Sequence, residues 1–183
     1  MRITPIEKED KTGRIITLRN AEISDAENLI TYMKITSFET PFLLREPDEF
    51  HLTSEPEECF IPNTIDNPRE LMLLATADGS HTGNCSLSGA GPFKRYQHRG
   101  QIANGLYQKY RGCGIGQMKL STILSGAREL GYEQVELEVA ANNTSAVALY
   151  KKLGCQTYGT FPDNIKYADG SYTEMLWMMK KLI

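Results

Sequence analysis

The chain has 183 residues, of which 40% are hydrophobic, and a formal net charge of −3. This length fits one domain with a normal core, and the slightly acidic balance provides no basic field to attract nucleic acid. No stretch approaches the ~20 apolar residues of a membrane span, and no basic start leads into an apolar run. The sequence therefore predicts a single domain over residues 1–183, located in the cytoplasm.

The cysteines and histidines show no pattern typical of a metal site. The four cysteines are far apart and form no Cys-x-x-Cys pair, and the three histidines are equally scattered. In a chain without a signal peptide, such cysteines are expected to be free thiols. We expect neither a disulfide framework nor a bound metal.

The first quarter of the chain predicts a strand followed by a helix. Residues 1–13 are polar and are expected to be irregular, whereas residues 14–19 alternate as a strand does. Ser24 and Glu27 have the spacing of a capping box ahead of a helix that runs through Ile35. The order is strand, then helix.

An acidic, proline-punctuated stretch and a hairpin come next. Residues 38–67 carry many acids, and Ser54 with Glu57 repeats the capping-box spacing, which predicts a second, short helix. Such a run of acids is typical of a solvated surface, or of a rim that attracts cationic substrates. Residues 71–76 and 81–87 then predict two antiparallel strands joined by a turn at Asp78-Gly79.

A strand, a glycine-rich loop and a long helix occupy the middle of the chain. Residues 100–107 predict a strand, and Gly105 within it marks a bulge or a close approach of another group to the backbone. The loop runs from Gln108 to Gly116, and apolar residues at helical spacing follow it as far as Leu130. Gly131 then stands where a helix ends in a left-handed residue.

This unit has the properties of a phosphate site. The first amides of a helix lack internal partners and favour an anion, and the loop glycines allow the backbone to come close to one. A dinucleotide fingerprint is a rival interpretation, because Glu136 lies about twenty residues beyond Gly116. It fails at its third glycine, since that position holds Gln117 or Lys119, depending on where the count begins.

The last third of the chain alternates strands with a helix. In residues 135–139, Glu136 and Glu138 share one face of a strand while the apolar residues share the other. Asn143 is expected to cap a helix that Gly154 ends. Residues 156–160 and 172–179 predict the closing strands, and the strands on either side of the long helix are expected to be parallel neighbours.

Two stretches together resemble the GCN5-related N-acetyltransferase (GNAT) family. Arg111-x-x-Gly114-x-Gly116 is similar to that family's coenzyme A loop, and Asn143-x-x-Ala146-x-x-Leu149-Tyr150-x-Lys152-x-Gly154 is similar to its second helix motif. The resemblance covers residues 101–160, and this half is closest to the ribosomal-protein alanine N-acetyltransferases. It implies an α/β fold of one domain, with a mixed, mostly antiparallel sheet that is splayed between its fourth and fifth strands and flanked by about four helices.

The resemblance also implies acetyl-CoA as cofactor and assigns the residues that bind it. Its pantetheine arm would pair with the backbone of Asn104, Gly105 and Leu106 and with the side chain of Asn143. Its pyrophosphate would lie on the loop and helix start, at Arg111, Gly112, Cys113, Gly114, Ile115, Gly116 and Gln117.

The implied reaction is direct attack of a primary amine on the thioester in a ternary complex. Tyr150 matches the family's tyrosine that protonates the coenzyme A thiolate. Many members carry a carboxylate on the strand before the loop, where this chain has Gln101 and Asn104. The resemblance makes Glu138 the candidate base, because it lies twelve positions before Tyr150, as does a proposed base in the ribosomal-protein alanine acetyltransferases. Glu136 or water are the alternatives. A covalent route through Cys113 is disfavoured, because Cys113 occupies a variable position of the loop motif.

Other features leave the acceptor and the partners open. A protein amino terminus, a polyamine, an amino acid or an aminoglycoside would all fit, and the choice is expected to lie with residues 38–58 and a late loop at residues 161–172. An exposed sheet edge admits a homodimer. The rival function is a non-catalytic acyl-CoA-binding module that acts as a sensor or interaction protein.

Overall fold

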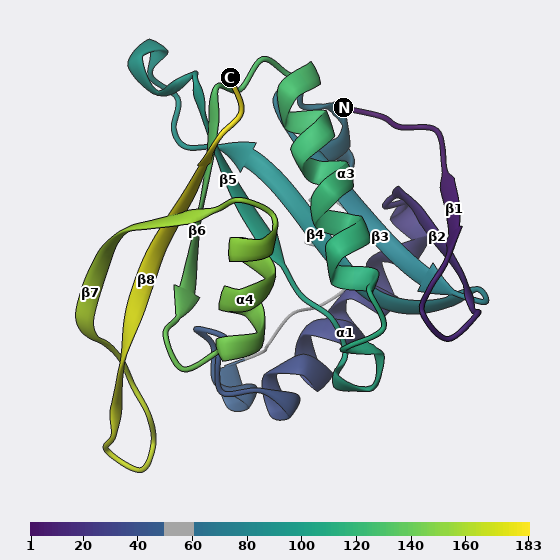
Figure 1. The fold of residues 1–183 in the computed structure, drawn as a ribbon. Helices are drawn as coiled ribbons and strands as arrows, with labels where there is room; N and C mark the ends of the chain where they lie inside the picture. The colour runs from purple at the N-terminus through teal and green to yellow at the C-terminus, as the bar shows by residue number, and fades with distance from the viewer. Residues whose placement is uncertain (50–60) are drawn as a thin grey trace.

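The computed structural model describes residues 1–49 and 61–183, which form one eight-stranded sheet with helices on both faces (Figure 1). The strands lie in the order β1-β2-β3-β4-β5-β6-β8-β7. They are β1 (Ile6–Glu9), β2 (Ile15–Asn20), β3 (Leu71–Ala77), β4 (Ser80–Gly89), β5 (Arg99–Asn104), β6 (Gln134–Ala140), β7 (Gln156–Lys166) and β8 (Tyr172–Lys181). The helices are α1 (Ala26–Glu39), α3 (Ile115–Glu129) and α4 (Thr144–Lys152), and residues 61–66 are also helical.

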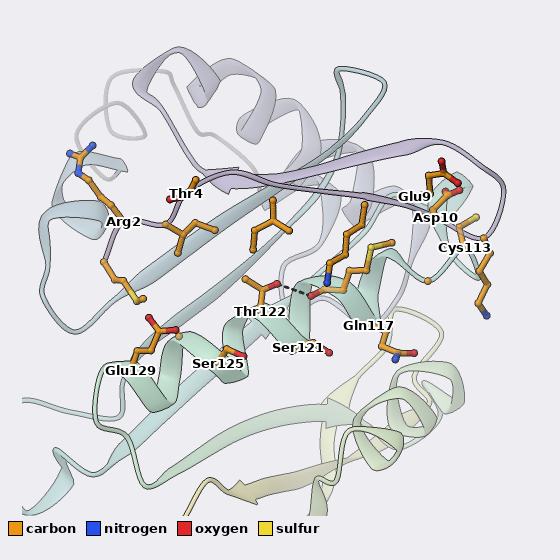
Figure 2. A pocket seen from close by; sticks show the side chains of 18 residues that line it. Arg2, Thr4, Glu9, Asp10, Cys113, Gln117, Ser121, Thr122, Ser125 and Glu129 are labelled. Carbon is orange, nitrogen blue, oxygen red and sulfur yellow. Dashed lines mark hydrogen bonds between the residues drawn. The ribbon is translucent and has the colours of Figure 1, made fainter.

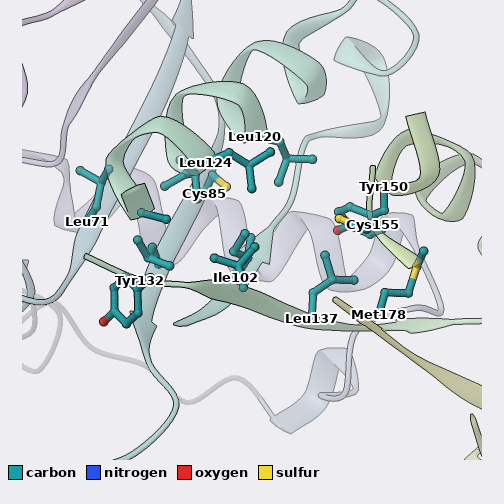
Figure 3. Close-up of a cluster of buried hydrophobic side chains, with 14 of the residues drawn as sticks. Leu71, Cys85, Ile102, Leu120, Leu124, Tyr132, Leu137, Tyr150, Cys155 and Met178 are labelled. Carbon is teal, nitrogen blue, oxygen red and sulfur yellow. The ribbon is translucent and has the colours of Figure 1, made fainter. Parts of the chain in front are cut away.

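Alternation along β3 separates two cores. Leu71 and Leu73 belong to the larger cluster, which also includes residues of α3, β5, β6, α4 and β8 (Figure 3). Met72 and Leu74 point the other way and pack with Leu29 of α1. Since successive side chains of a strand face opposite sides, α3 and α4 cover one face of the sheet and α1 covers the other.

The sheet opens between β5 and β6, as the resemblance implied. These two strands are parallel, and only three residue pairs join them: Arg99 with Gln134, Gly100 with Val135, and Gln101 with Glu136. Beyond these pairs β5 continues to Asn104 and β6 to Ala140. The remaining neighbours in the sheet are antiparallel. The predicted mixed sheet with a splay is confirmed.

Several predictions about strands need correction. Residues 6–9, expected to be irregular, form the edge strand β1, so the splay lies between the fifth and sixth strands. Half of the expected late loop belongs to β7, which runs to Lys166. The register of β4 with β5 is unbroken. The bulge of this part of the sheet lies between β3 and β4, where Thr82 is the extra residue opposite Ala75 and Thr76. Of the two alternatives predicted for Gly105, the bulge is therefore wrong and the close approach is confirmed, because a Cβ there would meet the hydroxyl of Tyr32.

Most of the predicted helix ends and the hairpin turn are confirmed. Gly131 and Gly154 have φ of 78° and 85°, and Asp78-Gly79 turns the chain between β3 and β4. The capping box lies two residues earlier than expected, with Glu22 and Asp25 as its members, because Asp25 also binds Arg19.

The helix start predicted at Ser54 lies outside the residues that the structure describes. Within the described ranges, no helix has the length and apolar character needed to cross a membrane.

Candidate active site at the gap between β5 and β6

The backbone of β5 and of the residues after it offers unused groups toward the gap. Gly105 donates its N–H to the carbonyl of Asn84 on β4 at 3.1 Å, and Tyr107 donates to Thr82 at 3.0 Å. In an antiparallel pair these groups alternate in direction, so the backbone groups of Asn104 and Leu106 face away from β4, toward the gap. This edge can accept an extended, amide-bearing ligand as an additional strand.

The glycine loop leads from this edge into α3. Gly112 and Gly114 have φ of 81° and 93°, and a Cβ on Gly112 would meet no atom within 4 Å. The first backbone bond of α3 runs from the N–H of Met118 to the carbonyl of Gly114, so the amides of Ile115, Gly116 and Gln117 precede the helical ladder. The loop therefore has the open backbone and the unpaired amides that suit a phosphate.

The third glycine of the loop serves packing. A Cβ on Gly116 would lie 3.2 Å from Cδ2 of Leu149 and 3.5 Å from Cδ1 of Leu106. Gly116 thus lets α4 and the segment after β5 come close to the start of α3. Asn143 caps α4 by accepting the N–H of Ala146 with its Oδ1, which leaves its Nδ2 donor as the group that would face a ligand.

Tyr150 of α4 lies in the larger core, with 7% of its surface exposed. Burial raises the pKa of Tyr150 to about 12, the Cys85 thiol adds to the rise, and the side chain of Asn104 acts against it. Oδ1 of Asn104 is itself buried, and it has no hydrogen-bond partner among residues 1–49 and 61–183. The structure therefore places a protonated phenol and an unsatisfied amide oxygen together beside the free edge of β5.

The two glutamates of β6 have different environments. Glu136 is buried, and Arg99 donates to both of its oxygens. The Arg99 contact lowers the pKa of the Glu136 carboxyl, which makes it a poor proton acceptor. Glu138 is exposed and lies opposite Trp177 of β8. Of the two carboxylates considered in the sequence, Glu138 is the accessible one.

Sequence reasoning missed an aromatic cluster on the α1 face of the sheet. The ring centroids of Tyr32 and His81 are 5.2 Å apart, and Tyr107 lies 5.0 Å from Tyr32. Burial lowers the pKa of His81 to about 4, and neither ring nitrogen has a partner within the described part of the chain. The hydroxyl of Tyr32 would be 2.1 Å from a Cβ on Gly105, which explains the glycine there.

A groove of about 810 Å³ lies between α3 and the N-terminal segment (Figure 2). Its walls are the N-terminal segment, including Arg2 and Glu9, and the side chains of α3 from Gln117 to Glu129. It reaches the glycine loop at Cys113 and Gly114 but does not include Tyr150 or Glu138. The predicted catalytic residues therefore lie outside this groove.

The chain is similar to known acetyltransferases in sequence and in structure. The family model described as Acetyltransferase (GNAT) family matches residues 35–155. Uncharacterized N-acetyltransferase YdgE of Bacillus subtilis is 33% identical over 109 residues, which are 60% of this chain and 69% of that protein. An acetyltransferase of the GNAT family from Streptococcus pneumoniae superimposes with a TM-score of 0.86 at 27% identity, over 91% of this chain and 99% of that one.

The predicted likeness to ribosomal-protein alanine acetyltransferases is also confirmed. A Bacillus subtilis protein provisionally named as an alanine N-acetyltransferase of ribosomal protein bS18 is 23% identical over 162 residues, 88% of this chain and 93% of that one. Acetyl-CoA is the cofactor of the matched family, and proteins of this fold have been solved with it.

Proposed function

Because the chain belongs to the acetyltransferase (GNAT) family and is thus an acyltransferase, we propose that it N-acetylates a primary amine, with acetyl-CoA as the donor. The amine attacks the thioester directly in a ternary complex, with Tyr150 as general acid and Glu138 as general base. The observation that carries this proposal is the position of these two residues on opposite faces of the sheet, on either side of the gap.

The cofactor site follows from the free edge and the loop. Backbone groups of Asn104 and Leu106 would pair with the pantetheine arm, and Nδ2 of Asn143 would donate to it. The pairing predicted for Gly105 is wrong, because its N–H donates to Asn84 and its carbonyl accepts from Lys119. Arg111 and the amides of residues 112–117 would hold the pyrophosphate. The unsatisfied Oδ1 of Asn104 supports this assignment, because a buried acceptor without a donor is costly unless a ligand supplies one.

Tyr150 is suited to give a proton to a sulfur. Bound acetyl-CoA supplies an acetyl group as a thioester, and its thiolate must be protonated when the carbon–sulfur bond breaks. With its pKa raised to about 12, the Tyr150 hydroxyl stays protonated throughout the physiological range. It lies on the α4 face with Leu137 and Val139 of β6, the face from which the sulfur would leave.

Glu138 is suited to receive the proton of the amine. It alternates with Leu137 and Val139 along β6, so its side chain lies on the opposite face, where α1 packs. Trp177 lies directly across from it on β8, and the Glu138 charge acts on Tyr158 of β7, whose pKa is raised mainly by burial. A carboxylate beside two aromatic rings attracts the cationic form of an amine before it is deprotonated.

Two measurements on the purified protein test the proposal. Calorimetry should detect binding of coenzyme A and acetyl-CoA, and release of free thiol should depend on an added amine. The panel should hold peptides with free amino termini, polyamines, amino acids and an aminoglycoside; the relative named for bS18 favours including its N-terminal peptide. No binding of coenzyme A would refute the cofactor site. Binding without thiol release for any amine would favour the rival acyl-CoA-binding module.

Two other expectations remain predictions. One is the cytoplasmic location. The other is a homodimer formed through an exposed sheet edge.

A further inference from the structure

Lys119 of α3 is a fully buried lysine that binds backbone carbonyls where β4 meets the segment after β5. Its side chain is 0% exposed, and its Nζ donates to the carbonyls of Asn84 at 2.7 Å and Gly105 at 2.5 Å. It lies four residues from Ile115 and from Ile123, both of which are also fully buried, so the helical period turns it toward the sheet. Burying an ammonium is costly, and a structural carbonyl contact alone is a weak reason to retain one.

The peptide group that Lys119 contacts is the one whose N–H faces the gap. In a trans peptide the carbonyl of Gly105 and the N–H of Leu106 point in opposite directions. The carbonyl points to Lys119, and the Leu106 N–H therefore points toward the splayed side of β5. Among residues 1–49 and 61–183 this N–H has no acceptor. The ammonium and the unused donor lie at the two ends of one polarisable amide.

Tyr32 holds this peptide from the opposite face of the sheet. Its hydroxyl lies so close to Gly105 that a Cβ would be 2.1 Å away, and α1, which carries Tyr32, packs on the face opposite α3. The peptide between Gly105 and Leu106 is therefore fixed by an amphipathic aromatic side chain on one side and by a charge on the other. A fixed dipole needs little reorganisation when charge develops near it.

We infer that Lys119 is a positioning residue for catalysis: its ammonium polarises the Gly105–Leu106 peptide, so that the Leu106 N–H donates more strongly to the carbonyl oxygen of the bound acyl thioester. This inference rests on the proposed function and deepens it. Hydrogen bonds in a chain strengthen one another, and a charged donor strengthens the chain most. Stronger donation stabilises the negative charge that develops on the oxygen as the amine attacks.

The matched control is Lys180 of β8, which also donates its Nζ to a backbone carbonyl, that of Leu153 at 2.6 Å. It is partly buried and lies away from the free edge of β5. Lys119→Met removes a charge and two lysine–carbonyl bonds, and Lys180→Met removes a charge and one such bond; both keep the length of the side chain. A purely structural role would give the two variants similar effects on turnover.

The readouts are kcat from thiol release, the affinity for coenzyme A, and the infrared carbonyl stretch of bound acetyl-CoA labelled with 13C at the thioester carbon. We expect Lys119→Met to lower kcat about tenfold, because removing a direct oxyanion donor costs ~10²- to 10³-fold and this residue acts through a peptide. The affinity for coenzyme A should stay within about threefold, and the carbonyl stretch should rise in frequency. Lys180→Met should match wild type in all three. Equal kcat and equal stretch in wild type and Lys119→Met would overturn the inference.

A measurement on wild type alone covers the case in which Lys119→Met does not fold. Burial lowers the pKa of Lys119 to about 8. The titratable groups that interact with it are displaced from that range: the pKa of His81 is lowered to about 4 and that of Cys85 is raised to about 12. The pKa of Tyr150, which interacts with Cys85, is also raised to about 12. Burial also raises the pKa of Tyr32 above its ordinary value. The carbonyl stretch of bound acetyl-CoA should therefore rise in frequency between pH 7 and pH 9, and a constant stretch would overturn the inference.

The two proposals fail in different ways. Wild-type protein that binds no coenzyme A refutes the proposed function. Wild-type protein that binds and turns over, while Lys119→Met does the same at equal rate and equal carbonyl frequency, refutes the role of Lys119 alone.

Discussion

Arg99 donates two hydrogen bonds to the carboxylate of Glu136, from Nε to Oε1 and from Nη2 to Oε2, each 2.6 Å long. Gln134 donates a third, to Oε1 at 2.7 Å. Because of these contacts, Glu136 supports the sheet, whereas Glu138, the other acid of β6, is open to a substrate.

Replacing Glu138 should therefore affect catalysis, whereas replacing Glu136 should affect stability. Glu138→Gln should lower acetyl transfer by a factor of about 10² and leave coenzyme A affinity nearly unchanged, since it removes a base and no cofactor contact. Glu136→Gln should lower the free energy of unfolding by about 1 to 2 kcal/mol, because solvent partly screens the ion pair with Arg99. Chemical denaturation and thiol release check both variants. Wild-type turnover by Glu138→Gln would eliminate it as the base.

Tyr150→Phe should lower kcat by about 10² while the protein melts at nearly the same temperature, because a phenyl ring keeps the packing of the core and only the proton donor is lost. Because the pKa of Tyr150 is raised to about 12, its hydroxyl stays protonated up to pH 10. The rates of wild type and of this variant should therefore depend on pH in the same way between pH 7 and 10. Unchanged kcat in Tyr150→Phe would rule out Tyr150 as general acid.

Gly112→Ala should weaken coenzyme A binding about tenfold or more, because a methyl group would stand over the loop where the phosphate is expected. Gly131→Ala is a matched control at the other end of α3. The two glycines have φ of 81° and 78°, and a Cβ on either meets no atom within 4 Å. Each substitution should cost about 1 kcal/mol of stability. If calorimetry gave the two variants equal affinity for coenzyme A, the loop would not be the phosphate site.

Because of His81, the protein should become less stable as the pH falls from 6.5 to 4. Burial lowers its pKa to about 4, whereas the unfolded chain binds the proton near 6.5, so between these values the unfolded state carries more protons. The predicted loss is on the order of 2 kcal/mol after discounting for solvent. His81→Phe, which keeps a ring beside Tyr32 and Tyr107, should remove most of this slope in urea denaturation. An equally steep slope in the variant would contradict the prediction.

The sequence predicts well those features that one short stretch determines. The ends of α3 and α4 depend on Gly131, Asn143 and Gly154, each of which acts on its own backbone, and the Asp78-Gly79 turn is equally local. The glycine loop is a local signal of the same kind. These predictions required no knowledge of distant neighbours.

The features that sequence reasoning missed depend on contacts between distant segments. The partners Arg99 and Glu136 are 37 residues apart, and only the sheet register brings them together. Lysine is a residue type that is usually exposed, whereas the position of Lys119, four residues after Ile115, places it on the buried face of α3. Residues 6–9 are mostly charged, as suits an edge strand with a burial pattern of one half-buried and three exposed residues.

The three residue pairs that join β5 to β6 all lie at one end of the strands. The gap between the strands is therefore closed at Arg99 and Gln134 and open at the other end. Beyond Gln101 and Glu136, no ladder pair joins the described residues of these two strands. A cofactor whose amides pair with the free side of β5 would act as a removable ninth strand, so each catalytic cycle would complete the sheet and then take it apart again.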